Sequence, residues 1–170
     1  MATTRRSTLA GNRLDATDWN ILRELQENGR ITNVELAGRV GLSTPACLRR
    51  MRALERSGLV QSYCALLDEK KAGFDVTAFA MVGLHRQSEA DLLAFEELVR
   101  SWPLVRECYM LSGEIDFILK CVTPDLATFQ RFVIDELTAA PNVDSVKTSL
   151  AIRRSKFAPG VPIAESVSGG

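Results

Sequence analysis

The sequence predicts an α+β protein with a helical N-terminal unit and a C-terminal unit in the order β-α-β-β-α-β. Apolar residues recur at helical spacing up to about residue 58, and apolar runs typical of strands follow from residue 76. The charge changes at the same place. Residues 1–58 hold 10 Lys/Arg and 6 Asp/Glu, whereas residues 59–170 hold 11 Lys/Arg and 15 Asp/Glu. A chain of 170 residues has room for two small units, each with its own core.

The first unit is expected to begin with two short helices. Asp15 is placed to cap the first helix, which the pair Asn28-Gly29 ends. Thr32 and Glu35 have the spacing of a capping box, so a second helix should start there. Gly41 ends that helix, at a position where a left-handed backbone is accessible to glycine.

A third helix is expected between Ser43 as its N-cap and Gly58 as its end, with Pro45 tolerated in the first turn. Side chains three or four positions apart share a face of a helix. The inner face then carries Cys47, Leu48, Met51 and Leu54, and the opposite face carries Arg49, Arg52 and Arg56.

Two short helices joined by a tight turn, the second apolar on one face and basic on the other, are typical of a helix-turn-helix. The second helix of this motif enters the DNA major groove. The alternative is a solvated arginine face on an ordinary surface helix, but the turn spacing and both caps favour the motif. We therefore expect double-stranded DNA as a partner, with Arg52 and Arg56 on phosphates. The candidate DNA-binding residues are Ser43, Thr44, Pro45, Ala46, Arg49, Arg50, Arg52 and Arg56.

The second unit is expected to be a ferredoxin-like split βαβ unit. Strands are predicted over 59–67, 76–84, 105–111, 115–122 and 143–153, and helices over 88–101 and 124–137, with a hairpin turn at 112–114. The first of these strands would link the two units. Both helices would cover one face of the sheet and leave the other in need of cover, so we expect at least a homodimer.

The remaining composition argues against several classes of protein. Four cysteines without CxxC spacing, and no His or Cys cluster at metal-ligand spacing, predict no metal and no cofactor. No apolar run reaches the length of a transmembrane helix, and the N-terminus lacks the apolar core of a signal peptide. We therefore expect a cytoplasmic protein with reduced thiols and no membrane partner.

The chain resembles the Lrp/AsnC (leucine-responsive regulatory protein, feast/famine) family of transcriptional regulators over roughly residues 14–156. The two blocks that carry the resemblance lie in separate units and in the expected order. They comprise Leu14-Asp15, Asp18, Ile21-Leu22, Leu25, Asn28-Gly29-Arg30, Leu36-Ala37, Val40-Gly41-Leu42-Ser43, Arg50, Leu54-Glu55 and Gly58, and then Leu111-Ser112-Gly113-Glu114-Ile115-Asp116-Phe117.

This resemblance implies a winged-type helix-turn-helix domain followed by an ACT-like RAM domain that binds an effector and oligomerises. The expected boundaries are a flexible arm at 1–13, the DNA-binding domain at 14–60, a linker strand and hinge at 61–74, the RAM domain at 75–157 and a flexible tail at 158–170. It also implies a nucleoid-associated regulator that binds pseudo-palindromic operators as a dimer, tetramer or octamer. An amino-acid effector would modulate both its assembly and its DNA binding.

By the same resemblance, the effector site lies at the turn over residues 111–116, in a cleft between protomers. Gly113 would let backbone N–H groups approach an α-carboxylate, and Glu114 or Asp116 would hold an α-ammonium. From the residues alone, the favoured interpretation of Gly113-Glu114 is a plain hairpin turn, with Asp116 as a turn-capping side chain. The resemblance reverses this preference. The candidate effector residues are Leu111, Ser112, Gly113, Glu114 and Asp116, with Thr148, Ser149 and Leu150 from the last strand as part of the wall.

Two other functions are compatible with this pattern. An enzyme is disfavoured because His85 is the only histidine and Cys108 has no histidine base beside it in the sequence. An architectural protein that compacts DNA without an effector is the second alternative. It would bind operator and random duplex with similar affinity.

Overall fold

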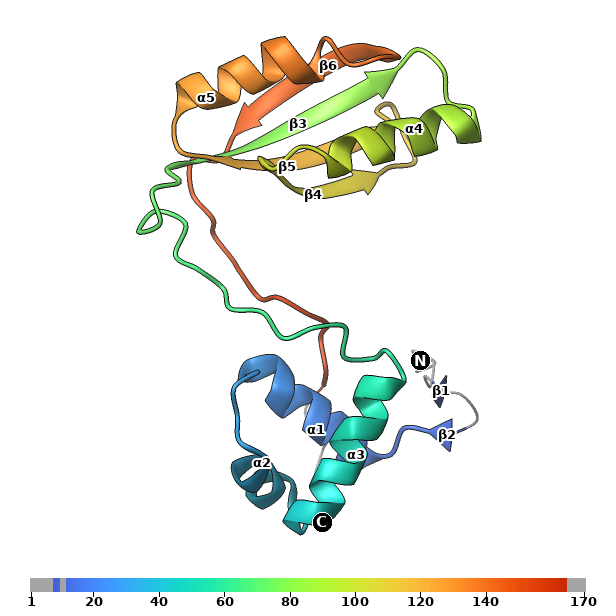
Figure 1. Cartoon of the computed structure of the whole chain (residues 1–170), viewed down its shortest axis with the longest axis vertical. Helices are drawn as coiled ribbons and strands as arrows, with labels where there is room; N and C mark the ends of the chain where they lie inside the picture. The colour runs from blue at the N-terminus through green and yellow to red at the C-terminus, as the bar shows by residue number, and fades with distance from the viewer. Residues whose placement is uncertain (1–7, 10–11, 165–170) are drawn as a thin grey trace. The chain divides into compact units, whose positions relative to one another are not determined.

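The computed structural model describes residues 8–9 and 12–164 (Figure 1). The chain divides into two compact units, one formed by Met1–Leu66 with Phe157–Gly170 and the other by Leu67–Lys156. The described residues 157–164 therefore belong to the first unit, and the flexible tail expected at 158–170 stays a prediction.

The first unit contains three helices, α1 (Ala16–Glu27), α2 (Asn33–Val40) and α3 (Thr44–Arg56). The predicted caps of α1 and α2 are confirmed. The side chains of Asp15 and Asp18 each accept a hydrogen bond from the backbone N–H of the other, at 2.8 and 3.1 Å. Thr32 and Glu35 form the same reciprocal box at the start of α2. Gly41 has φ 69°, the left-handed conformation that allows the sharp turn into α3.

A single apolar cluster holds the three helices together. Ile21, Leu36 and Cys47 have no exposed surface, and Leu54 is 1% exposed. The same cluster includes Leu14, Leu25 and Ala37, with Trp19, Leu22, Ile31, Val40, Leu42, Met51 and Val60 packed around it. Of the inner face predicted for α3, Cys47, Met51 and Leu54 pack in this cluster, whereas Leu48 is half-buried outside it.

The strand predicted after these helices is wrong, and the segment before them is described only in part. Residues 59–67 form no strand, and Leu66 and Leu67 are 61% and 73% exposed. The apolar run lacks a neighbouring strand to pair with, and pairing is what stabilises extended backbone. The arm expected at 1–13 contains two short strands, β1 (Thr8–Leu9) and β2 (Asn12–Arg13), paired antiparallel. The rest of that arm lies outside the described residues.

The second unit has the predicted order. Its elements are β3 (Val76–Leu84), α4 (Glu89–Arg100), β4 (Val105–Met110), β5 (Phe117–Thr123), α5 (Leu126–Arg131), the π-helical turn η1 (Phe132–Leu137) and β6 (Val143–Leu150). The strands form one antiparallel sheet in the order β4-β5-β3-β6. Figure 1 shows α4 and α5 on the same side of this sheet. The ferredoxin-like fold is thus confirmed, with β6 ending three residues before the predicted strand.

The two faces of the sheet are unequally covered. Along β3, Ala78, Ala80, Val82 and Leu84 are buried and pack in one core with residues of both helices, among them Phe95 and Phe132. The alternate residues of β3 are only half-buried and lie on the opposite face. The strand register places the following residues on that open face: Thr77, Phe79, Met81 and Gly83 of β3, Glu107 and Tyr109 of β4, Ile118 and Lys120 of β5, and Ser145, Lys147 and Ser149 of β6.

Candidate DNA-binding helix and effector-binding turn

Helix α3 exposes the basic face that the sequence predicted. Arg49, Arg52 and Arg56 are exposed, and they lie opposite the buried Cys47 and Leu54. The first turn also faces solvent, since Ser43, Thr44 and Pro45 are exposed and Ala46 is half-buried. Six of the eight candidate DNA-binding residues are therefore on the exposed surface of the helix and its N-terminus, and Ala46 and Arg50 are half-buried.

The N-terminus of α3 differs from those of α1, α2, α4 and α5. Each of those helices has a side chain that accepts an N-terminal N–H, whereas Ser43 makes no side-chain capping bond. Asn33, the first residue of α2, donates from Nδ2 to the carbonyl oxygen of Thr44 at 3.0 Å. This bond ties the start of α2 to the start of α3. Sequence reasoning missed Asn33, because a polar first residue of a helix does not reveal its long-range partner.

Arg50 lies away from that surface. Its Nη1 donates to Oδ2 of Asp15 at 2.7 Å and to Oδ1 of Asp18 at 2.8 Å, and its side chain is 33% exposed. In this structure Arg50 thus contacts the capping box of α1, and its contact with the groove stays a prediction. Burial raises the pKa of Asp15, but the Asp18 N–H and the Arg50 guanidinium outweigh it and leave that pKa lowered. The same two carboxylates raise the pKa of Arg50.

The turn between β4 and β5 is held by the backbone and by one carboxylate. The N–H of Leu111 donates to the carbonyl oxygen of Asp116, and the N–H of Asp116 donates to that of Val82, at 2.8 and 2.9 Å. Oδ2 of Asp116 accepts the N–H of Leu84 at 2.7 Å. Asp116 thus ties the hairpin to the end of β3, which is the turn-capping role considered from the sequence.

The tip of this turn is open to solvent. Leu111, Ser112, Gly113 and Glu114 are exposed, and a Cβ built on Gly113 would meet nothing within 4 Å. Within the described part of the chain, the N–H groups of Ser112, Gly113 and Glu114 donate to no other group. The tip therefore combines unused backbone donors with an exposed carboxylate.

The last-strand residues lie apart from the turn within one protomer. Phe117, which follows Asp116, pairs with Val82 of β3, and Val82 pairs with Val146 of β6. Leu150 is four residues beyond Val146, about 13 Å along the strand, and two strand spacings of about 4.8 Å separate β6 from β5. One protomer does not bring Thr148, Ser149 and Leu150 into contact with the turn.

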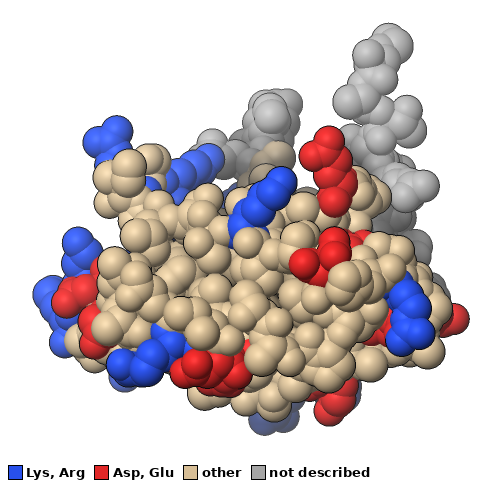
Figure 2. All heavy atoms as spheres, turned by 90° about the horizontal axis from the view of Figure 1, so that it is seen from above, with Lys and Arg blue, Asp and Glu red and all other residues tan. Residues whose placement is uncertain are grey.

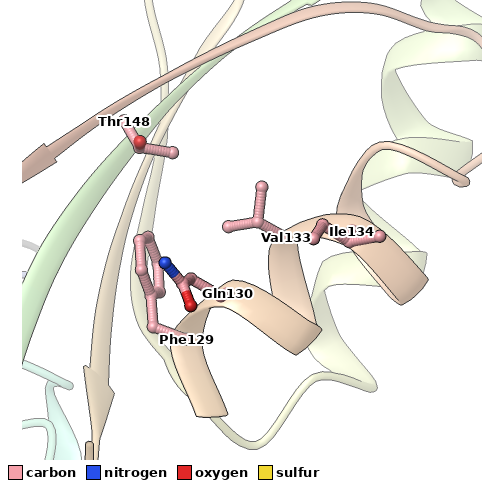
Figure 3. A pocket seen from close by; sticks show the side chains of 5 residues that line it. All are labelled: Phe129, Gln130, Val133, Ile134 and Thr148. Carbon is pink, nitrogen blue, oxygen red and sulfur yellow. The ribbon is translucent and has the colours of Figure 1, made fainter. Parts of the chain in front are cut away.

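Thr148 instead lines a shallow, open groove of about 100 Å³ beside the helices. The other lining residues are Phe129, Gln130, Val133 and Ile134, which come from α5 and the π-helical turn. Figure 3 shows Phe129 and Val133 between this helix and the strand that carries Thr148. The groove is mostly apolar and lacks the charged groups that an amino acid would need.

The charged side chains in Figure 2 are of both signs and mixed, with a wide uncharged area between them. The visible face in Figure 2 therefore carries charges of both signs, with no single-sign patch across it. In the residues that the structure describes, no group of three His, Cys, Asp or Glu side chains is arranged to hold a metal ion. Within the same ranges, every helix is too short or too polar to cross a membrane.

A three-helix unit with an exposed basic helix, joined to a ferredoxin-like unit with an open turn, defines a two-domain DNA-binding regulator. Residues 14–61 match the winged helix-turn-helix DNA-binding family, and residues 77–161 match the Lrp/AsnC ligand binding domain. A leucine-responsive regulatory protein from Rhizobium meliloti is 59% identical over 150 residues, which cover 88% of this chain and 96% of that protein. The chain belongs to the Lrp/AsnC family of transcriptional regulators.

More distant relatives agree in length and fold. The transcriptional regulator AzlB of Bacillus subtilis is 39% identical over 91% of this chain and 99% of its own length. A solved structure of a Neisseria meningitidis transcriptional regulator in complex with L-Met is 40% identical, with a TM-score of 0.83, and the match covers 88% of this chain and 96% of that one. An AsnC family transcriptional regulator from Agrobacterium tumefaciens is 34% identical, with a TM-score of 0.82 over 88% of this chain and 97% of the other.

Proposed function

We propose that this protein is a cytoplasmic, nucleoid-associated regulator that binds a pseudo-palindromic operator through α3. Its assembly and DNA affinity would change when an amino acid binds. The observation that carries the DNA-binding part is the division of α3 into a buried apolar face and an outer face with Arg49, Arg52 and Arg56 exposed. Arginine binds guanine bidentately in the major groove. The backbone N–H groups in the first turn of α3, which the Ser43 side chain does not cap, are suited to binding a phosphate.

The open face of the sheet supports a homodimer. Half-buried Phe79, Met81 and Ile118 share this face with Tyr109, which is 55% exposed. On the same face, Nζ of Lys120 lies 2.7 Å from Oε1 of Glu107, so these two charges neutralise each other. A face with an apolar centre suits a second copy of the same sheet, with Lys147 exposed on β6 at its edge. Two copies would give a regulator with two recognition helices. Tetramers and octamers would then form from such dimers.

The turn over residues 111–114 supports an amino-acid effector, because unused N–H donors suit an α-carboxylate and Glu114 suits an α-ammonium. Thr148, Ser149 and Leu150 would come from a neighbouring protomer. The L-Met complex of the Neisseria meningitidis relative supports this class of ligand. Binding and regulation, with no catalytic step, are sufficient to account for these features.

The function is tested with a duplex selected from a random library by the purified protein. Its affinity and the mass of the protein are measured with and without each of the twenty amino acids, alongside a thermal-shift screen of the same set. An effector present at 100 times its Kd stabilises the fold by about 2.7 kcal/mol. Equal affinity for selected and random duplex would favour an architectural role, and no response to any amino acid would rule out the effector.

A further inference from the structure

In the part of the chain that the structure describes, the side chain of Gln26 binds the C-terminal segment to the first helix. Gln26 of α1 donates from Nε2 to the carbonyl oxygen of Val161 at 2.8 Å, and its Oε1 accepts the N–H of Val161 at 3.0 Å. One amide group thus satisfies both backbone groups of one residue, as a neighbouring strand would. The two residues are 135 positions apart in the sequence.

Gly160 makes this approach possible. Its φ is +93°, and a Cβ at this position would lie 2.5 Å from Cδ and 2.9 Å from Cγ of Gln26. An L side chain would therefore be strained by the backbone and would also displace the amide. The segment is fitted to Gln26 by its backbone conformation as well as by two hydrogen bonds.

The outgoing segment is anchored at the same end of α1. The hydroxyl of Tyr63 donates to Oε1 of Glu55 at 3.0 Å, and Cδ1 of its ring lies 3.3 Å from where a Cβ on Gly29 would be. Gly29 is three residues from Gln26, just beyond the end of the helix. The outgoing and the returning segment are therefore both held near the C-terminal end of α1.

The two segments are also joined within the second unit. Nη1 of Arg154 lies 3.3 Å from Oε1 of Glu69, so an ion pair connects the returning segment to the outgoing one. The chain thus crosses between the units twice, and each crossing has an anchor. With the Gln26 contact released, the returning crossing would lose an anchor on the DNA-binding unit, and the crossing after Tyr63 would keep its own.

We infer that residues 157–163 are a strap that belongs to the DNA-binding unit, and that the Gln26–Val161 clamp raises operator affinity by limiting how far the two DNA-binding units of a dimer reorient. This inference rests on the proposed dimeric DNA binding. Two recognition helices bind two half-sites more tightly when their separation is restricted, because the effective concentration of the second helix rises. Binding to one half-site gains nothing from that restriction.

The test compares Gln26→Ala with the full-length wild type, and Gln61→Ala serves as a control at an exposed position in the same unit. Hydrogen exchange at Val161 reports the clamp directly. Affinity is measured for the duplex selected by the wild type, and for the same duplex with one half-site scrambled. We expect Gln26→Ala to lose protection at Val161 and to bind the intact duplex three- to tenfold more weakly, with unchanged half-site affinity. Gly160→Val should also lose protection at Val161 and bind the intact duplex more weakly, and it leaves the sequence of α1 unaltered.

Three results would overturn the inference. Fast exchange at Val161 in the wild type would show that the clamp does not persist in solution. If Gln26→Ala loses affinity equally for the intact and the scrambled duplex, Gln26 only stabilises the helical unit. Unchanged affinity for both duplexes would show that the strap does not affect binding. Failure of the wild type to select any duplex would instead refute the proposed function, while the exchange measurement would still decide whether the clamp exists.

Discussion

Arg50 of the recognition helix and Asp18 of α1 form an ion pair with 2.8 Å between Nη1 and Oδ1. The same Nη1 lies 2.7 Å from Oδ2 of Asp15, and these two acids are the reciprocal capping box of α1. One guanidinium therefore connects α3, the proposed DNA-binding helix, to the N-terminus of the first helix. The strap is held at the other end of α1, so this helix contacts both the recognition helix and the returning chain.

Arg50 and Arg52 should affect DNA binding in different ways. Affinity for DNA falls as the salt concentration rises, and each phosphate contact contributes about 0.9 to the magnitude of the slope of log affinity against log salt. We expect Arg52→Ala to reduce that magnitude by about 0.9 without a change in Tm. Arg50→Ala should leave the slope unchanged and destabilise the helical unit by about 1 kcal/mol, as expected of a partly exposed ion pair. Salt titrations and thermal unfolding of both variants check this. If Arg50→Ala reduces the magnitude of the slope as much as Arg52→Ala does, Arg50 contacts DNA.

Acid should weaken the helical unit through Asp15. The pKa of its carboxyl is lower in the folded protein, so the charge stabilises the fold above the unfolded value of about 3.9. That stabilisation is lost as the pH falls through the folded value. Asp15→Asn keeps the cap but removes the charge, so its unfolding free energy should fall less between pH 5 and pH 2.5. Urea titrations at both pH values test this, because the two values lie above and below the unfolded pKa of about 3.9. Equal losses would exclude Asp15 as the source.

Asp116 and Glu114 should have separable roles at the turn. Asp116→Ala leaves the N–H of Leu84 without its acceptor, which costs about 1–3 kcal/mol, so the Tm without ligand should fall. Glu114 is exposed, so Glu114→Gln should keep that Tm and reduce the shift caused by an amino acid. Thermal shifts with and without the effector compare the two. A full ligand shift in Glu114→Gln would remove this carboxylate from the site.

The open sheet face should control dimer formation. Phe79 lies near its centre, on β3 between β5 and β6, so Phe79→Asp would place an unpaired charge in the proposed interface. We expect monomers in sedimentation equilibrium. Leu93→Asp is the matched control, because Leu93 is an apolar side chain on α4 that is 57% exposed. If Phe79→Asp keeps the mass of the wild type, the protomers associate through another face.

Much of the fold follows from local patterns. The Thr32–Glu35 box, the turn at Gly41 and the periodicity of the strands each involve neighbours in the sequence, and all were predicted and found. The strand predicted over 59–67 was wrong because apolar content alone cannot supply a pairing partner. The basic face of α3 was also predictable, since helical spacing decides which arginines point away from the core.

By itself, the sequence determined the order of elements, the buried and basic faces of α3 and the family. Tertiary structure alone decided where long-range side chains bind. Arg50 and Asp15 are 35 residues apart, Asp116 and Leu84 are 32 apart, and Gln26 and Val161 are 135 apart. Caps and periodicity depend on a few adjacent residues and are therefore visible in sequence. Whether an arginine meets DNA or two carboxylates depends on how separate helices pack, which no local pattern specifies.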